Sequence, residues 1–251
     1  MSIKLAETEE DLIYPESDGK PVGENTTHVH WIHMLHANLV DLYADQENGF
    51  VASNLFWYPV LDHPELNTAP DVMVVPDRPK GHRRSYRQWR EGNRPPAVVF
   101  EIVSPSNSEE EMDLKRQFYE RYGVREYYLY DPDTKELDGY RRRGQRLVPI
   151  RQLHDWTSPI LGIRFDLSGE ELLLDHPDGS PFRTHAEIRR DAIEAQELAY
   201  QRELEAKKAA AAAQKMIKQR DEEVKEAHRK QELFAQKLRE QGIDPDSILG
   251  N

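Results

Sequence analysis

The feature that most constrains this 251-residue chain is an apolar run that contains one carboxylate, Ala97–Val103 with Glu101 inside it. The run predicts a strand, and strand side chains alternate between two faces. Glu101 is therefore expected beside Val99 on one face, with Phe100 on the other. The strand is expected to be mostly buried, where a carboxylate is costly unless it is paired, protonated or bound to a cation. This residue alone predicts a polar site inside the core.

The segment upstream predicts a helix. Thr26 or Thr27 can cap a helix that begins near His28, and Asn48-Gly49 is expected to end it. Apolar residues recur along one face of this helix at Ile32, Leu35, Leu39 and Leu42. That spacing predicts a helix packed against a core.

Two strands are expected between this helix and the Glu101 strand. Phe50–Tyr58 is rich in aromatic and β-branched residues, as strands are. Val72–Val75 is a short apolar run, and Asp71 directly precedes it. Asp71 is therefore expected at the start of a strand.

Downstream, Ser108 can cap a helix that Gly123 ends. Glu126–Tyr130 is an aromatic strand, and Leu137–Ile150 predicts a hairpin that turns at Arg143-Gly144. The order of elements is then helix, three strands, helix, strand. We expect a single α/β domain over residues 1–182.

The remainder, residues 183–251, predicts a helical tail. No Gly or Pro occurs between Pro181 and Gly242, and Ala, Glu, Lys, Gln and Arg dominate. Heptad-like positions are occupied in two registers, by Ala192, Ala199, Ala206, Ala213 and Ala227 and by Ala210, Ile217, Val224 and Leu238. This alanine-rich seam predicts a weak coiled coil, and with it a homo-oligomer that is a dimer or larger.

Charge and composition limit the partners. The net charge of −12 disfavours general nucleic-acid binding, yet basic residues gather in two loops. They are Lys80, Arg83, Arg84, Arg87, Arg90 and Arg94, and then Arg141, Arg142, Arg143 and Arg146. Cysteine is absent, the acidic N-terminus is unlike a signal peptide, and no apolar run is long enough to span a bilayer. We expect a soluble cytoplasmic protein without membrane association.

The residues that can carry chemistry are Asp71, Glu101 and Lys115. Two carboxylates from neighbouring strands can bind Mg²⁺, which takes oxygen ligands together with waters and phosphate. A nearby lysine could position a water or stabilise developing charge on a phosphate. The spacing alone is weak evidence, because an acid–X–Lys triplet would need lysine at Val103. A surface pair of Lys115 with Glu111 is the simpler interpretation of that lysine.

The region Asp71–Pro132 resembles a large bacterial family of putative restriction endonucleases with the PD-(D/E)XK nuclease fold. The residues that carry the resemblance are Ala69-Pro70-Asp71-Val72, Pro95-Pro96, Glu101-Ile102-Val103-Ser104-Pro105-Ser106, Lys115-x-x-x-Tyr119, Gly123-Val124-x-Glu126-Tyr127 and Asp131-Pro132. Further matching segments are Ser17–Pro21, Asn54-Leu55, Ser158-Pro159-x-Leu161-Gly162 and Gly242-Ile243-Asp244-Pro245. The resemblance therefore covers nearly the whole chain.

The resemblance implies a metal-dependent DNA endonuclease whose lysine is displaced from the strand to the following helix. Asp71 and Glu101 then match the metal-binding acids, with Mg²⁺ as the cofactor and Mn²⁺ as its substitute, and Lys115 matches the catalytic lysine. Glu111 stands where relatives usually have Asp, so its role stays open. Three sets of residues are further candidates: Glu24 as an additional acid, Tyr119 beside the lysine, and Arg83, Arg84 and Arg87 as contacts to the DNA backbone.

Other interpretations remain. Glu24 can equally be a helix-terminal charge. The histidines at 28, 30, 33 and 36 spread around the helix axis, which favours surface or packing roles over a zinc site. The nuclease fold could instead be a catalytically silent module for protein assembly through its tail. A phosphodiesterase for RNA or small nucleotides is a third hypothesis.

Overall fold

The computed structural model describes residues 14, 15, 25–240 and 242. Glu24, Ser17–Pro21 and Ile243-Asp244-Pro245 lie outside the described residues. Contacts divide the chain into two compact units after Ile188.

The first unit is built on a mixed sheet whose strands lie in the order β1-β3-β5-β6-β7-β8. These strands are β1 (Asn48–Ser53), β3 (Val72–Pro79), β5 (Val98–Ile102), β6 (Glu126–Tyr130), β7 (Leu137–Arg143) and β8 (Arg146–Pro149). β5 and β6 are parallel, whereas the other neighbours are antiparallel. The prediction of an α/β fold is confirmed.

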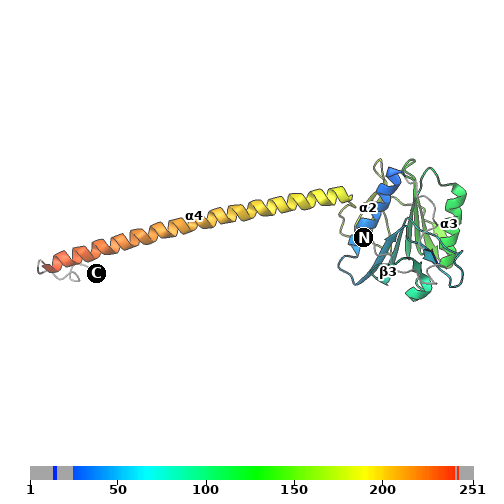
Figure 1. The fold of residues 1–251 in the computed structure, drawn as a ribbon. Coiled ribbons are helices and arrows are strands. Elements are labelled where there is room, and N and C mark those ends of the chain that lie inside the picture. The colour runs from blue at the N-terminus through cyan, green and yellow to red at the C-terminus, as the bar shows by residue number, and fades with distance from the viewer. Residues whose placement is uncertain (1–13, 16–24, 241, 243–251) are drawn as a thin grey trace. The chain divides into compact units, whose positions relative to one another are not determined.

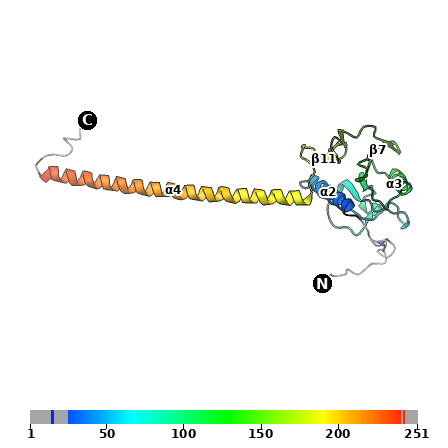
Figure 2. The same cartoon turned by 90° about the horizontal axis from the view of Figure 1, so that it is seen from above.

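Two helices cover opposite faces of this sheet (Figures 1 and 2). α2 (Thr26–Leu42) packs Leu35 and Leu39 against the face that carries Phe100. α3 (Glu109–Tyr122) packs against the other face, which carries Val99. The predicted alternation within β5 is therefore confirmed. All five residues of β5 are buried, so each face contributes apolar area to stability.

Smaller strands complete the unit. β2 (Trp57–Tyr58) pairs in parallel with β4 (Tyr86–Arg87), which leads into a 3₁₀ turn, η1 (Gln88–Glu91). β9 (Trp156–Thr157), β10 (Arg164–Asp166) and β11 (Leu173–Asp175) form a second antiparallel sheet. Buried Glu126 accepts a hydrogen bond from the Ser158 hydroxyl, which fixes the segment next to β9 on the main sheet.

Local sequence signals located some element ends and missed others. The Ser108 side chain accepts from the Glu111 amide, and Gly123 ends α3 at φ 102°, as predicted. The cap of α2 is Asn25 rather than Thr26 or Thr27, since the Asn25 side chain accepts from the His28 amide at 2.7 Å.

Two further boundaries also differ from the prediction. α2 ends at Leu42, before Asn48-Gly49, and those two residues begin β1. The predicted strand Phe50–Tyr58 is broken at Asn54, whose φ of 50° is incompatible with an extended chain.

Asn38 of α2 ties the end of the first unit to its core. Its side-chain amide donates to the Arg183 carbonyl at 2.7 Å, and its carbonyl oxygen accepts from the Arg183 amide at 2.9 Å. Asn38 is buried whereas Arg183 is exposed, so these bonds anchor a surface segment to the buried side of α2. The next residue, Thr184, forms a capping box with Glu187 at the start of the last helix.

That helix, α4 (His185–Glu240), has 56 residues. The predicted long C-terminal helix is confirmed. Salt bridges of the Glu-to-Lys (i, i+4) type support it at Glu203–Lys207 and Glu226–Lys230. None of the helices in the described part of the chain is long and apolar enough to cross a membrane.

Gly49 provides a test of the packing between α2 and β1. A Cβ at Gly49 would lie 2.3 Å from the Tyr43 ring, whereas one at Gly81 would meet nothing within 4 Å, although both glycines have positive φ. Each substitution by alanine carries a backbone cost of roughly 1–3 kcal/mol. Gly49→Ala should lower the free energy of unfolding by about 2 kcal/mol more than Gly81→Ala, because Tyr43 must move. Urea denaturation measures both, and equal losses would show that the Tyr43 contact is unimportant.

Candidate active site

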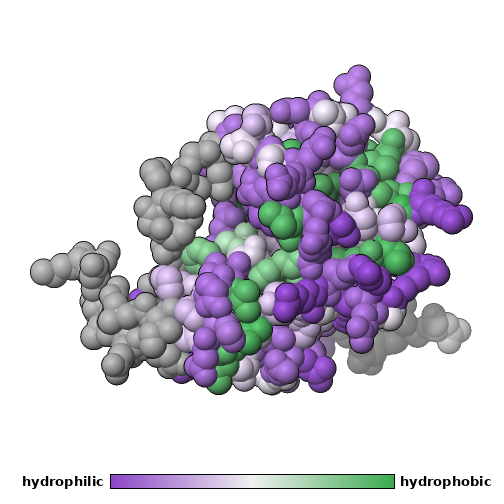
Figure 3. All heavy atoms as spheres, turned by 90° about the vertical axis from the view of Figure 1, so that its right-hand side faces the viewer, coloured by the Kyte–Doolittle hydropathy of each residue, from purple (hydrophilic) through white to green (hydrophobic). Residues whose placement is uncertain are grey.

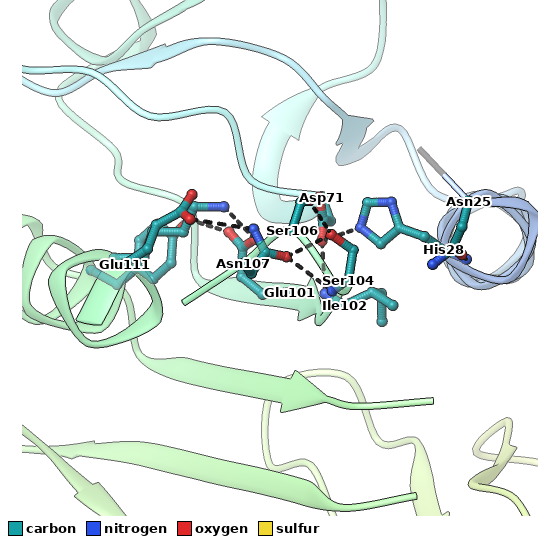
Figure 4. Close-up of polar contacts among 11 residues, drawn as sticks. Asn25, His28, Asp71, Glu101, Ile102, Ser104, Ser106, Asn107 and Glu111 are labelled. Carbon is teal, nitrogen blue, oxygen red and sulfur yellow. Dashed lines mark hydrogen bonds and ion pairs between the residues drawn. The ribbon is translucent and has the colours of Figure 1, made fainter. Parts of the chain in front are cut away.

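The sheet itself brings the two acids together. β3 and β5 are antiparallel with Val72 opposite Phe100, so extending the register by one pair places Asp71 opposite Glu101. Asp71 Oδ2 accepts the main-chain N–H of Ile102 at 2.7 Å, and both acids are buried. Figure 4 shows Asp71 and Glu101 beside each other at the end of the strand.

α3 supplies two groups that hold Glu101. The Tyr119 hydroxyl donates to Glu101 Oε1, and the Lys115 ammonium donates to Oε2 at 2.9 Å. Lys115 and Tyr119 are four residues apart, so they share one face of the helix. Lys115 thus contacts the strand carboxylate and not Glu111, contrary to the simpler interpretation of its sequence position.

Burial makes the charges of this site interdependent. Burial, and then the neighbouring Asp71, raise the pKa of Glu101 to about 7, against the opposing effects of Lys115 and Tyr119. Burial alone would lower the pKa of Lys115, but Glu101, Asp71 and Glu111 together raise it. Lys115 therefore stays protonated near neutral pH, whereas Glu101 is poised between its two protonation states.

The turn between β5 and α3 fixes where the helix begins. Asn107 Oδ1 accepts from the Ser104 amide at 2.9 Å and from the Ser104 hydroxyl at 3.0 Å. Asn107 Nδ2 lies 3.5 Å from Glu111 Oε2, at the limit of a hydrogen bond. Glu111 is exposed and faces this turn, as Figure 4 shows. The turn aligns α3 so that Lys115 meets the strand that carries Glu101.

His28 is a site neighbour that the sequence did not reveal. Its Nε2 lies 3.3 Å from Asp71 Oδ2, and its ring is buried at the start of α2 (Figure 4). A surface or packing role was expected for this histidine, and its contact with an acid of the site was missed. The two residues are 43 positions apart, so no local pattern could have paired them.

The arginines proposed for DNA contact have partners of their own. Arg83 forms a two-pronged salt bridge with Glu91, at 2.7 and 3.1 Å, and its guanidinium lies 3.9 Å from the centre of the Phe50 ring. Arg87 is buried, with Nε 3.2 Å from Ser85 Oγ. Arg84 is half-buried. Arg83 and Arg87 therefore have clear structural roles.

The residues present fit a hard divalent cation. Mg²⁺ is commonly held by one or two carboxylates and retains several waters, and Asp71 with Glu101 supplies that number. Among the described residues, no donor contacts Asp71 Oδ1, so one carboxylate oxygen is available to a ligand. A cation would also relieve the proximity of two buried acids, which raises the pKa of Glu101. No cluster of three or more His, Cys, Asp or Glu residues suited to a metal occurs in the described part of the chain.

The raised pKa of Glu101 predicts a pH-dependent stability difference. The folded state binds a proton between pH 4.5 and about 7 that the unfolded state has lost, so ionisation of Glu101 destabilises the fold as pH rises through this window. Glu101→Gln mimics the protonated acid and should gain stability relative to the parent chain between pH 5 and pH 8. The gain should be at most on the order of 3 kcal/mol. Urea denaturation at both pH values, without divalent cations, measures it, and a constant difference would contradict the shift.

Comparison with known proteins identifies the family of this chain. No curated protein matches the chain. A crystal structure of a putative nuclease of the DUF820 family from Anabaena variabilis matches with 17% sequence identity and a TM-score of 0.40, over 57% of this chain and 79% of that one. That similarity is too low to support an argument about fold. The family model of Uma2, described as putative restriction endonuclease, matches residues 4–170. Since this is most of the first unit and well over half of the chain, the protein belongs to the Uma2 family of putative restriction endonucleases.

Proposed function

We propose that the protein is a metal-dependent endonuclease of the PD-(D/E)XK type that hydrolyses phosphodiester bonds in DNA. The observation that carries the proposal is the buried Glu101, which lies opposite Asp71 and receives a hydrogen bond from Lys115. A structural ion pair does not require a second carboxylate beside it, because the second acid raises the cost of ionising the first. Membership of the Uma2 family supports the same conclusion.

Each residue would have a distinct role. Asp71 and Glu101 would hold Mg²⁺, or Mn²⁺ in its place. When bound, the cation would neutralise charge on the scissile phosphate and lower the pKa of a bound water. Lys115 would orient the attacking water or stabilise charge that develops on the phosphate. Tyr119 would keep Glu101 in the orientation that serves the cation.

Four further residues complete the proposal. Glu111 and Glu24 are candidates for an additional acid, and Glu111 contributes to the field at Lys115. Arg84 of the basic loop is a candidate for a contact to the DNA backbone, whereas Arg83 would first have to leave its salt bridge with Glu91. His28 would keep Asp71 in place.

Lys115 gives the sharpest test. Lys115→Met should reduce cleavage of plasmid DNA in Mg²⁺ or Mn²⁺ by about 100-fold or more, because one preorganised charge is lost. The matched control is Lys135→Met, which removes a lysine whose 3.0 Å pair with Glu171 lies on the surface, and it should cleave like the parent chain. Calorimetry should show Mn²⁺ binding by Lys115→Met but not by Asp71→Asn. Full cleavage by Lys115→Met would exclude Lys115 from the reaction, and equal Mn²⁺ binding by Asp71→Asn would exclude the metal site.

A second candidate function is protein assembly through α4, either beside the nuclease activity or in its place. Large apolar side chains are exposed along this helix, among them Ile217, Val224 and Phe234. These three fall at a and d positions of one heptad register, whereas exposed Leu233 does not. A second copy of the chain would cover the a and d side chains.

The seam can be tested with charges. Val224→Asp combined with Phe234→Asp should shift the protein towards the monomer, because charged groups would enter the seam. Leu233→Asp should leave the mass unchanged, since that position faces away from the seam. Light scattering over a range of concentrations measures the mass. If the double variant and the parent chain have the same mass at every concentration, α4 is not an oligomerisation helix.

A further inference from the structure

A groove on the outward side of α3 has a charge opposite to that of the chain as a whole. It encloses about 820 Å³ between α3, the β7–β8 turn and Leu66. Its charged lining consists of Arg116, Arg121, Arg142, Arg146 and Glu120. The chain carries a net charge of −12, so this local excess of arginine is a distinct feature of the surface. Figure 3 views the molecule from the side on which α3 lies, and this face is mostly hydrophilic with smaller hydrophobic patches.

The one acidic residue in the lining does not neutralise the groove. Glu120 Oε1 accepts from Arg146 at 3.1 Å, and its Oε2 accepts from the Leu147 amide at 2.8 Å. Arg146 nevertheless has 81% of its side chain exposed. Arg121 is exposed and has no carboxylate partner among the described residues; its guanidinium lies 5.6 Å from the centre of the Tyr122 ring. Two arginines are therefore open to an anion.

A third arginine is fixed as part of the wall. Arg142 donates to the carbonyl oxygens of Glu120 at 2.5 Å and Val124 at 2.7 Å, at the carboxyl end of α3. A cation is favourable there, because the last carbonyls of a helix carry partial negative charge. Among the described residues, no acidic side chain forms a hydrogen bond with Arg142, so its positive charge stays in the groove. Arg116 is paired with Asp113, so Arg121, Arg142 and Arg146 supply the positive charge of the groove.

Apolar side chains lie between these charges. Phe118 and Tyr122 contact each other with ring centres 4.6 Å apart, and both line the groove in a half-buried state. Leu114 lies on the same surface and is 59% exposed. Arginines beside aromatic rings suit a single nucleic-acid strand, whose phosphates and unstacked bases are both accessible. A duplex would present only its phosphates to such a groove.

Two segments join the groove to the carboxylate site. α3 carries Lys115 and Tyr119 on one side and the groove residues on the other. Leu66 belongs to the segment that leads into Asp71, five residues later. We propose that this groove binds a single strand of the nucleic acid on which the protein acts. The choice of nucleic acid over another polyanion rests on the proposed function.

Fluorescence anisotropy with a labelled 20-nucleotide thymidylate strand, in EDTA and at low salt, tests this proposal without cleavage. Arg121→Ala combined with Arg146→Ala should weaken binding by about tenfold and lower the slope of log Kd against log salt by about 1.4. Tyr122→Leu should weaken binding by about tenfold at an unchanged slope, because a stacking contact is lost. The matched control is Arg94→Ala, which removes an exposed arginine from the other basic loop, where it pairs with Asp77. It should bind within twofold of the parent chain.

Several outcomes would overturn the proposal: unchanged binding by the double variant, an equal loss in Arg94→Ala, tighter binding of the matching duplex than of the single strand, or no binding by the parent chain. Circular dichroism checks that the variants fold. Arg121 and Arg146 are exposed, so their replacement does not disturb the core. The result is separable from the proposed activity. If the groove variants weaken binding but the parent chain does not cleave DNA, the groove proposal stands and the proposed nuclease activity is wrong. If the parent chain cleaves DNA but the double variant binds as tightly as the parent chain, the nuclease activity stands and the groove proposal is wrong.

Discussion

The first unit depends on a carboxylate that the sheet buries and α3 satisfies. Glu101 is buried, so its charge must be balanced by Lys115 and Tyr119, which reach it from the helix. This requirement fixes the rotation of α3 about its axis. It also constrains the connection before α3, because the Ser104–Asn107 turn must place the start of the helix where Lys115 can reach Glu101. The polar contacts of the site and the packing of α3 on the sheet therefore depend on the same placement of the helix.

Much of the fold was predictable because its signals are local. The alternation in β5 divides its side chains between the two cores, and Ser108 and Gly123 determine the ends of α3 through neighbouring backbone groups. The same local reasoning failed around α2. Two threonines were expected to cap α2, but Asn25 is the cap. The strand breaks at Asn54 because this residue has a positive φ, which asparagine tolerates but which the sequence pattern does not reveal.

Asp71 and Glu101, which the structure brings together, could be singled out from the sequence, but their contacts could not. Glu101 is identified by the mismatch between a charge and its apolar neighbours, which a sequence displays directly. The partner of Lys115 could not be read in this way, because Glu111 at i−4 and Glu101 on a strand are both acidic and only burial decides between them. His28 lies beyond both kinds of signal, since its contact with Asp71 is long-range and its neighbouring histidines show no common face. The loop arginines were chosen by charge alone, and the partners of Arg83 and Arg87 became visible only in three dimensions.

α2 contacts both the site and the residues that precede α4. Near its start His28 lies against Asp71, and ten residues later Asn38 holds the backbone of Arg183. The two contacts are about 15 Å apart along one continuous helix. A helix of this length moves as a stiff rod, so a shift of α2 along its axis would change both contacts together. A load applied to the chain at Arg183 would therefore act on the same rigid element that carries His28, the neighbour of Asp71.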